Sequence, residues 1–271
     1  MADNKSYKKS NFRGAFFFLP KEKRIALSII YDFCRTADDI ADEGFIDAKE
    51  RLDALRAEVK NIFDNSPKTP LGSALRAVLE KYPMPERYFT DLIDGVERDL
   101  KTPVRFDTFE DLKWYMYRVA GVVGKMCVEI FGYTNEQTKE YAEILGYAVQ
   151  LTNIIRDIEQ DAKIDRVYLP KEDLDGFALT EEDILSAKRQ TKLKDLLLFE
   201  LERAQNYYEK ADFILPAEDF KAMLAARAMG NIYCALLKKL QKNPCRFNSK
   251  KIKLNKLEKF FILLKTFMEK P

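Results

Sequence analysis

The sequence predicts an all-α protein. Apolar residues recur at helical spacing through most of the chain, and the alternating pattern typical of strands is scarce. The 271 residues include only ten glycines and ten prolines, so few positions interrupt the helical pattern. The composition, 46% hydrophobic and 33% charged, is that of a soluble globular protein. No repeat or linker divides it, and we expect a single helical domain over residues 1–271.

The elements follow from local signals along the chain. Residues 1–10 are polar and predict a mobile lead-in, and Pro20 can open the first helix, which stops at Gly44. The DNSPKTP stretch after residue 63 is a loop signal that ends a second, amphipathic helix. Further helices are predicted over residues 71–82, 85–100, 108–131, 181–215 and 218–241, with another between Gly132 and Pro170.

Glycine breaks the regular pattern inside the predicted helix 108–131. Gly121 and Gly124 lie within its apolar second half, where each costs roughly 1 kcal/mol relative to alanine. We expect these glycines to allow the close approach of a neighbouring helix or of a bulky ligand. The tail from residue 248 is basic and amphipathic, and its lysines lie beside Phe260, Phe261, Ile262 and Leu263.

Two helices are predicted to carry acidic stripes. On the first, Tyr31, Arg35, Asp38 and Asp42 share one face, and Asp39 lies about 100° away from Asp38. On the second, the stripe consists of Gly146, Gln150, Asn153, Asp157 and Asp161, and apolar residues cover most of the remaining surface.

Buried carboxylates are costly unless a positive group meets them. Aspartate pairs are common on solvated helix edges, so either stripe alone would be weak evidence for a site. Two stripes on apolar helices could face each other across a cavity, where their carboxylates would repel without cations between them. Oxygen ligands of this kind suit Mg²⁺, which shares its coordination with water and substrate phosphates. The pattern therefore predicts a metal-lined interior site.

Composition excludes several classes of chemistry. The chain has no histidine, which removes Ser-His and Cys-His catalysis and most zinc or haem sites. Its four cysteines form no Cys-x-x-Cys pair and predict reduced thiols in a cytoplasmic protein. The polar N-terminus is not a signal peptide, and the apolar runs are too short to span a bilayer. A net charge of +2 argues against nucleic-acid binding.

Three stretches carry a resemblance to a known family. YDFCRTADDIADE, YMYRVAGVVG and LGYAVQLTNIIRDIEQDAKIDRVYLP resemble the signatures of the squalene/phytoene synthases, in the same order and at matching separations. The family joins two isoprenyl diphosphates head to head, in a helical bundle around a central cavity. CVEIFGY and DAKIDRVYLPKEDLDGF most resemble the bacterial presqualene diphosphate synthases of hopanoid biosynthesis.

The resemblance implies roles for individual residues. Asp38, Asp42, Asp157 and Asp161 would hold two or three Mg²⁺ ions on the substrate diphosphates with help from Asn153, and Tyr115 would act near the reacting carbons. The residues expected to bind substrate are Tyr31, Arg35, Gln150, Asn153, Arg156, Arg166, Tyr168 and Tyr233. Candidate aromatic groups for stabilising a carbocation are Phe16, Phe17, Phe18, Trp114, Tyr115 and Tyr117.

The resemblance also implies an activity and partners. The expected reaction is Mg²⁺-dependent condensation of two farnesyl diphosphates to presqualene diphosphate, with no nucleotide cofactor, because no Gly-rich turn after a strand is present. Squalene, dehydrosqualene and phytoene synthases share the motifs and remain alternatives, and terpene cyclases and chain-elongating prenyltransferases also use Asp-rich helices. The basic tail suggests peripheral contact with the inner face of the membrane. Enzymes acting downstream in the pathway are further candidate partners.

Overall fold

The computed structural model describes residues 19–186, 190–244 and 252–271. Within these ranges the chain is helical and contains no strand, which confirms the predicted all-α class. An isolated parallel bridge joins Val104 to Arg166. The lead-in of residues 1–10, the phenylalanines Phe16 to Phe18, and the lysines Lys250 and Lys251 of the tail lie outside the described residues.

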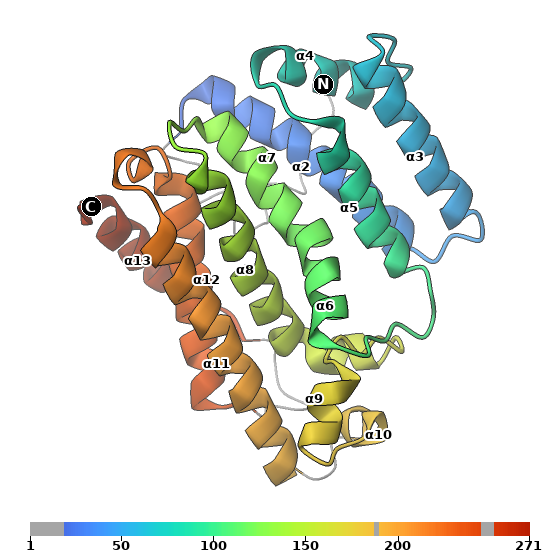
Figure 1. Cartoon of the computed structure of the whole chain (residues 1–271), viewed down its shortest axis with the longest axis vertical. Coiled ribbons are helices and arrows are strands. Elements are labelled where there is room, and N and C mark those ends of the chain that lie inside the picture. Colours follow the sequence, from blue (N-terminus) through green and yellow to red (C-terminus); the bar gives the residue numbers. More distant parts are fainter. Residues whose placement is uncertain (1–18, 187–189, 245–251) are drawn as a thin grey trace.

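Four helices form the N-terminal part of the described chain, which begins at residue 19. They are α2 (Lys21–Asp42), α3 (Ala48–Phe63), α4 (Pro70–Lys81) and α5 (Glu86–Arg98), each within a few residues of its predicted range. Helix α2 packs against α3, α4 and α5, and also against α7 in the middle of the molecule (Figure 1). Its buried face presents Ala26, Ile30, Phe33 and Ala37 to these neighbours, so the opposite edge carries the acidic stripe.

The predicted helix 108–131 is not a continuous α-helix. The chain forms α6 (Phe109–Met116), a π-helical segment η3 (Tyr117–Gly121) and α7 (Val122–Phe131). Thr108 and Asp111 form a capping box that starts α6. Single π turns inside α-helices commonly occur at functional sites, and no signal in the sequence identified this one.

Close contacts with neighbouring atoms explain three glycines in this region, two of them against backbone and Gly121 against side chains. A Cβ atom at Gly146 would lie 2.8 Å from the carbonyl oxygen of Ala120, and a Cβ at Gly124 would lie 2.5 Å from that of Ala142. A Cβ at Gly121 would lie 3.3 Å from Glu143. The expected close approach of a neighbouring helix is therefore confirmed, and that helix is α8 (Gln137–Ala162).

Helix α8 lies at the centre of the bundle. It packs against η3, α7, α11 (Gln190–Ile214) and α12 (Leu224–Lys242). The turn before it is fixed by the buried carboxylate of Asp219, which accepts hydrogen bonds from the backbone of Thr134 and Asn135 and from the Thr138 hydroxyl. This clamp joins the start of α8 to the segment that leads into α12.

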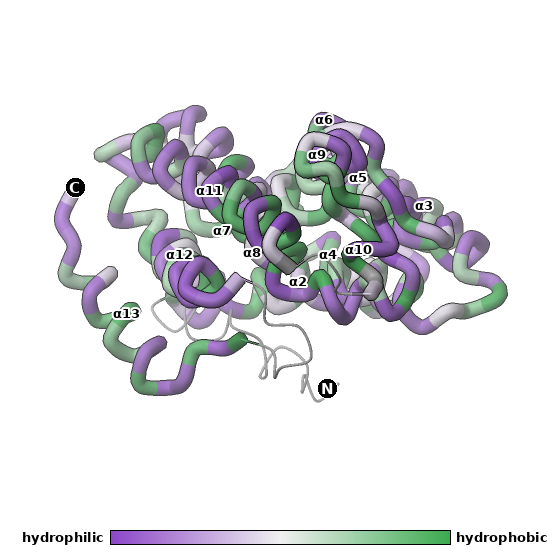
Figure 2. The backbone as a smooth tube through the Cα atoms, turned by 90° about the horizontal axis from the view of Figure 1, so that it is seen from below, coloured by the Kyte–Doolittle hydropathy of each residue, from purple (hydrophilic) through white to green (hydrophobic). Residues whose placement is uncertain are grey.

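The C-terminal half differs from the predicted pattern in several places. The range 181–215 contains α10 (Glu181–Leu185) and α11, separated by a turn at Ser186 and the undescribed residues 187–189, and α9 (Lys171–Gly176) was not predicted. The helix expected from residue 218 is preceded by a 3₁₀ turn, η4 (Ala217–Asp219), and begins at Leu224. The last helix, α13 (Lys256–Met268), packs on α12 at one end of the molecule (Figure 2).

Candidate active site

Helix α2 carries Asp38 and Asp42 at helical spacing, but both residues are exposed, so this stripe is not buried in the interior as expected. Asp38 is surrounded by protein, but its side chain remains open to solvent. Loss of hydration, reinforced by the negative charge of Asp42, raises the pKa of Asp38 to about 7. Arg35 forms its ion pair with Asp39 at 2.5 Å, and no ion pair between Arg35 and Asp38 is found among the described residues.

The stripe on α8 combines carboxylates with amides and an arginine. Arg156 donates to both oxygens of Asp157, at 2.8 and 2.5 Å, and it also lies near Tyr233 of α12. We expected a cation as the cheapest partner for these carboxylates; in this structure an arginine from the same helix neutralises Asp157. Gln150 and Asn153 precede Arg156 on the same helix, and Asn153 Nδ2 donates to Gln150 Oε1 at 3.5 Å.

The loop that follows α8 interacts with residues of both stripes. Arg166 in this loop donates to Asp42 of α2 at 2.9 Å, and the negative charge of Asp161 acts on Tyr168 two residues further on. Backbone hydrogen bonds between Val104 and Asp165 and between Val167 and Val104 hold the loop against the segment after α5. The structure thus brings Arg166 and Tyr168 to the same mouth as the aspartates.

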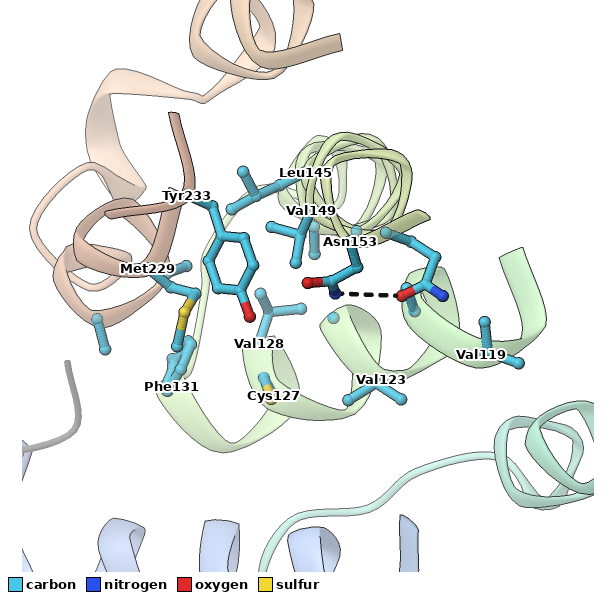
Figure 3. Close-up of a pocket in the computed structure, with 17 residues that line it drawn as sticks. Val119, Val123, Cys127, Val128, Phe131, Leu145, Val149, Asn153, Met229 and Tyr233 are labelled. Atoms are coloured by element: carbon cyan, nitrogen blue, oxygen red, sulfur yellow. Dashed lines mark hydrogen bonds between the residues drawn. The ribbon is translucent and has the colours of Figure 1, made fainter. Parts of the chain in front are cut away.

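An apolar cavity of about 180 Å³ lies beside this mouth. Side chains from η3, α7, α8 and α12 line it, and Figure 3 shows Asn153, Tyr233 and Met229 directed toward the same space. Gln150 and Asn153 lie at the end nearest Asp157, whereas Phe131, Leu145 and Met229 line the apolar end. Gln150, Asn153 and Tyr233 therefore belong to the wall, as expected for substrate-binding residues.

The structure adds Asp99, which the sequence analysis did not assign. Asp99 caps the C-terminus of α5, and its carboxylate accepts hydrogen bonds from Tyr115 at 2.8 Å and from Tyr168 at 3.0 Å. A negative charge at a helix C-terminus opposes the helix dipole, and an unfavourable position of this kind is a signal of function that the sequence contained. Burial is the main reason why the pKa of Asp99 is raised.

The aromatic side chains at the mouth differ from the expected set. Tyr115 and Tyr168 lie with ring centroids 5.4 Å apart, and Phe106 lies 5.4 Å from Tyr115. Trp114 is 44% exposed and lies under the guanidinium of Arg118, and Tyr117 lies near Lys125. Trp114 and Tyr117 thus form cation–π contacts with side chains of the protein. The rings that pack beside Tyr115 are those of Phe106 and Tyr168.

The donor atoms fit a hard divalent cation. Within the described residues, Asp38 has no hydrogen bond or ion pair, and the buried Asn153 Oδ1 has no hydrogen-bond partner. Unpaired buried oxygens are rare because they cost free energy, and carboxylate and amide oxygens are ligands that Mg²⁺ accepts. No group of three or more acidic or cysteine side chains is gathered for a metal in the part of the chain that is described. Substrate oxygens would therefore be needed to complete the coordination.

Comparison with known proteins identifies the family. The family model described as squalene/phytoene synthase matches residues 6–258. The chain belongs to the squalene/phytoene synthase family. It is therefore a prenyltransferase, and members of this family use a divalent metal with isoprenyl diphosphate substrates.

Curated relatives of this enzyme include phytoene synthases and a presqualene diphosphate synthase. The chain is 35% identical over 254 residues to the phytoene synthase of Mycobacterium tuberculosis, an alignment that covers 92% of this chain and 83% of the relative. It is also 35% identical over 266 residues to the presqualene diphosphate synthase of Zymomonas mobilis, covering 95% and 89% of the two chains. Sequence identity therefore does not separate the two products.

Solved structures share the fold. A dehydrosqualene synthase in complex with a ligand superposes with a TM-score of 0.86 at 30% identity, covering 96% of this chain and 92% of that one. A squalene synthase from Alicyclobacillus acidocaldarius gives a TM-score of 0.77 at 28% identity, covering 86% and 90%. Among the described helices, none is both long and apolar enough to cross a membrane.

Proposed function

We propose that this enzyme condenses two farnesyl diphosphates head to head, with Mg²⁺, to presqualene diphosphate and free diphosphate. The observation that carries the proposal is a polar mouth of aspartates and arginines that lies beside an apolar cavity. The polar mouth suits a diphosphate, and the apolar cavity suits a prenyl chain. Phytoene synthesis is the second candidate, because phytoene synthases are as similar in sequence as a presqualene diphosphate synthase.

Two observations favour chains of fifteen carbons. The CVEIFGY and DAKIDRVYLPKEDLDGF segments most resemble those of bacterial presqualene diphosphate synthases. A presqualene diphosphate synthase is also among the relatives that are 35% identical to this chain.

The residues at the mouth supply charge rather than nucleophiles. Breaking the allylic carbon–oxygen bond leaves negative charge on the departing diphosphate, which Arg35, Arg156 and Arg166 would neutralise. Bound Mg²⁺, held by Asp38, Asp42, Asn153, Asp157 and Asp161, would supply further electrostatic stabilisation of that leaving group. Each arginine now pairs with an aspartate, so binding of diphosphate and metal would exchange these ion pairs for new ones.

The apolar wall protects the cation that forms. An allylic cation must meet the double bond of the second chain before it meets water, and the wall of η3, α7, α8 and α12 excludes water from this end. The ring faces of Tyr115, Tyr168 and Phe106 can contribute about 0.5–2 kcal/mol of cation–π stabilisation. Loss of a proton then closes the cyclopropane ring.

A product assay tests the proposed reaction. With farnesyl diphosphate and Mg²⁺, we expect a cyclopropylcarbinyl diphosphate that accumulates whether or not NADPH is present. NADPH-dependent squalene would assign the enzyme to the reductive squalene synthases. Faster formation of a forty-carbon product from geranylgeranyl diphosphate would make it a phytoene synthase, and products of a single chain would indicate a cyclase.

We further propose that α13 contacts a membrane surface. The apolar side chains on its outer face are 44–70% exposed: Leu257, Phe260, Phe261, Leu264, Phe267 and Met268. Ile262 and Leu263 pack inward, and Lys239 of α12 pairs with Glu258 to hold the helix. An exposed apolar stripe flanked by lysines is typical of a helix that lies in the interface of an anionic bilayer.

Vesicle sedimentation tests the contact. Phe260→Ser with Phe261→Ser should reduce binding to anionic vesicles at least tenfold, because burying one phenylalanine contributes about 1.5–3 kcal/mol. Ile46→Ser is the matched control, since Ile46 is fully exposed in the loop after α2 and belongs to a different surface. Equal binding of both variants, or equal binding to neutral and anionic vesicles, would contradict the proposal.

A further inference from the structure

Asp99 joins two tyrosines that come from different parts of the chain. Its Oδ2 accepts the hydroxyl of Tyr115 from α6, and its Oδ1 accepts the hydroxyl of Tyr168 from the loop after α8. The two rings are tilted against each other, and Phe106 stacks on Tyr168 at 6.0 Å. Both phenols therefore donate to one carboxylate.

This carboxylate belongs to the mouth and not to a closed structural cluster. Asp99 is only partly buried, and its charge contributes to the raised pKa of Asp38. Arg166, which holds Asp42, also acts on Asp99 and opposes the rise in its pKa. Tyr115 is 4% exposed, and burial raises its pKa well above 10, so Tyr115 stays a neutral phenol. Asp99 is thus an ionisable group one hydrogen bond behind a neutral tyrosine.

The proposed reaction requires a proton acceptor near the reacting carbons, which is the position expected for Tyr115. When the cyclopropane ring closes, the electron pair of a carbon–hydrogen bond becomes the new carbon–carbon bond and a proton must leave. A neutral phenol is a poor base by itself, because accepting a proton would leave a cationic oxygen in an apolar site. A phenol that can pass its own proton to a carboxylate avoids that charge.

We propose that Asp99 receives this proton through Tyr115, a step that rests on the proposed function. The substrate proton moves to the Tyr115 oxygen while the phenol proton moves along the 2.8 Å hydrogen bond to Asp99. The organic cation becomes neutral, the carboxylate becomes a carboxylic acid, and Tyr115 is unchanged. Asp99 later releases the proton to solvent through its exposed side. Tyr168 holds the second oxygen, so Asp99 is a positioning residue as well as the final acceptor.

The test compares two products of one reaction. Asp99→Asn keeps the shape of the side chain but cannot take up the proton. With farnesyl diphosphate and Mg²⁺, we expect diphosphate release within about tenfold of wild type, whereas presqualene diphosphate falls about 10²–10⁴-fold. Prenyl alcohols formed with water should account for the difference. Tyr115→Phe breaks the same relay with Asp99 intact, and it should show the same fall of presqualene diphosphate relative to diphosphate. It serves as the test if Asp99→Asn does not fold.

Glu143→Gln provides a matched control. Glu143 also accepts a tyrosine hydroxyl, from Tyr147 at 2.7 Å, and pairs with Lys125, whereas the hydroxyls of Tyr115 and Tyr168 donate to Asp99. This variant should keep the wild-type ratio of presqualene diphosphate to diphosphate.

Three results would overturn the proposal. They are an equal fall of both products in Asp99→Asn, an unchanged ratio in Tyr115→Phe, and recovery of Asp99→Asn with excess Mg²⁺, which would make Asp99 a metal ligand. Failure of the proposed function is distinct, because the wild-type enzyme would then form no presqualene diphosphate.

Discussion

Asp38→Asn should lower Mg²⁺-dependent diphosphate release about 10²–10³-fold, the usual effect of removing one preorganised electrostatic group at a developing charge. Asp38 has no hydrogen-bond or ion-pair partner among the described residues, so its charge is available to a metal at the mouth. Excess Mg²⁺ should restore part of the rate if the main loss is metal affinity.

Asp39→Asn is the control for this substitution. Asp39 is the same residue type one position along α2, but it pairs with the exposed Arg35. Exposed ion pairs contribute only about 0–1 kcal/mol, so we expect Asp39→Asn to lose much less activity. An equal or larger loss for Asp39→Asn would show that the acidic stripe is assigned to the wrong face of α2.

Asp38→Asn should also change how the stability of the metal-free protein depends on pH. Asp38 has a pKa of about 7 in the folded chain against 3.8 as an unperturbed group, so folding favours its protonated form. The stability contributed by that form is complete below pH 3.8 and is lost as the pH rises through 7. Thermal melts of the metal-free protein between pH 4 and 8 should therefore fall more steeply for wild type than for Asp38→Asn. Parallel curves would contradict the assignment.

Gly146→Ala should lower both stability and turnover. The added methyl group would lie 2.8 Å from the carbonyl oxygen of Ala120 and 2.9 Å from the backbone nitrogen of Gly121, so η3 and α8 must separate. Overpacking of this kind costs about 1–3 kcal/mol, and the better helix propensity of alanine offsets about 1 kcal/mol or less. Because η3 carries Val119 and Ala120 of the cavity wall, turnover should fall as well.

Gly176→Ala is the matched control at the end of α9. A methyl group there would meet no atom within 4 Å, and Gly176 does not have a positive φ. Its melting temperature should equal or exceed that of wild type, while Gly146→Ala should melt several degrees lower, at about 2–4 °C per kcal/mol. Equal melting temperatures for the two variants would show that the η3–α8 contact adapts without cost.

Helical periodicity was sufficient to predict the fold class and the stripes, because side chains three and four positions apart share a face in any regular helix. No tertiary information was needed to place Asp38 with Asp42 on α2, or Gln150 with Asn153 on α8. The π-helical segment η3 could not be predicted in this way. It depends on how the chain packs against Gly146, a contact between segments that are separate in the sequence.

The charge partners in the site also depend on tertiary structure. Arg166 meets Asp42 across 124 positions of sequence, and Asp99 meets Tyr168 across 69. These contacts are created by the backbone hydrogen bonds that join the loop after α8 to the segment after α5. No local pattern records such pairings, although the unfavourable position of Asp99 at a helix C-terminus marked it as unusual.

A crystal structure with Mn²⁺ and a non-hydrolysable farnesyl thiodiphosphate would test most directly whether the two stripes form one site. We expect anomalous peaks for metal between α2 and α8, with Asp38 or Asp42 on one side, Asp157 or Asp161 on the other, and the farnesyl chain in the cavity that ends at Phe131. Metal bound at one stripe only, or a farnesyl chain outside the cavity, would contradict the account.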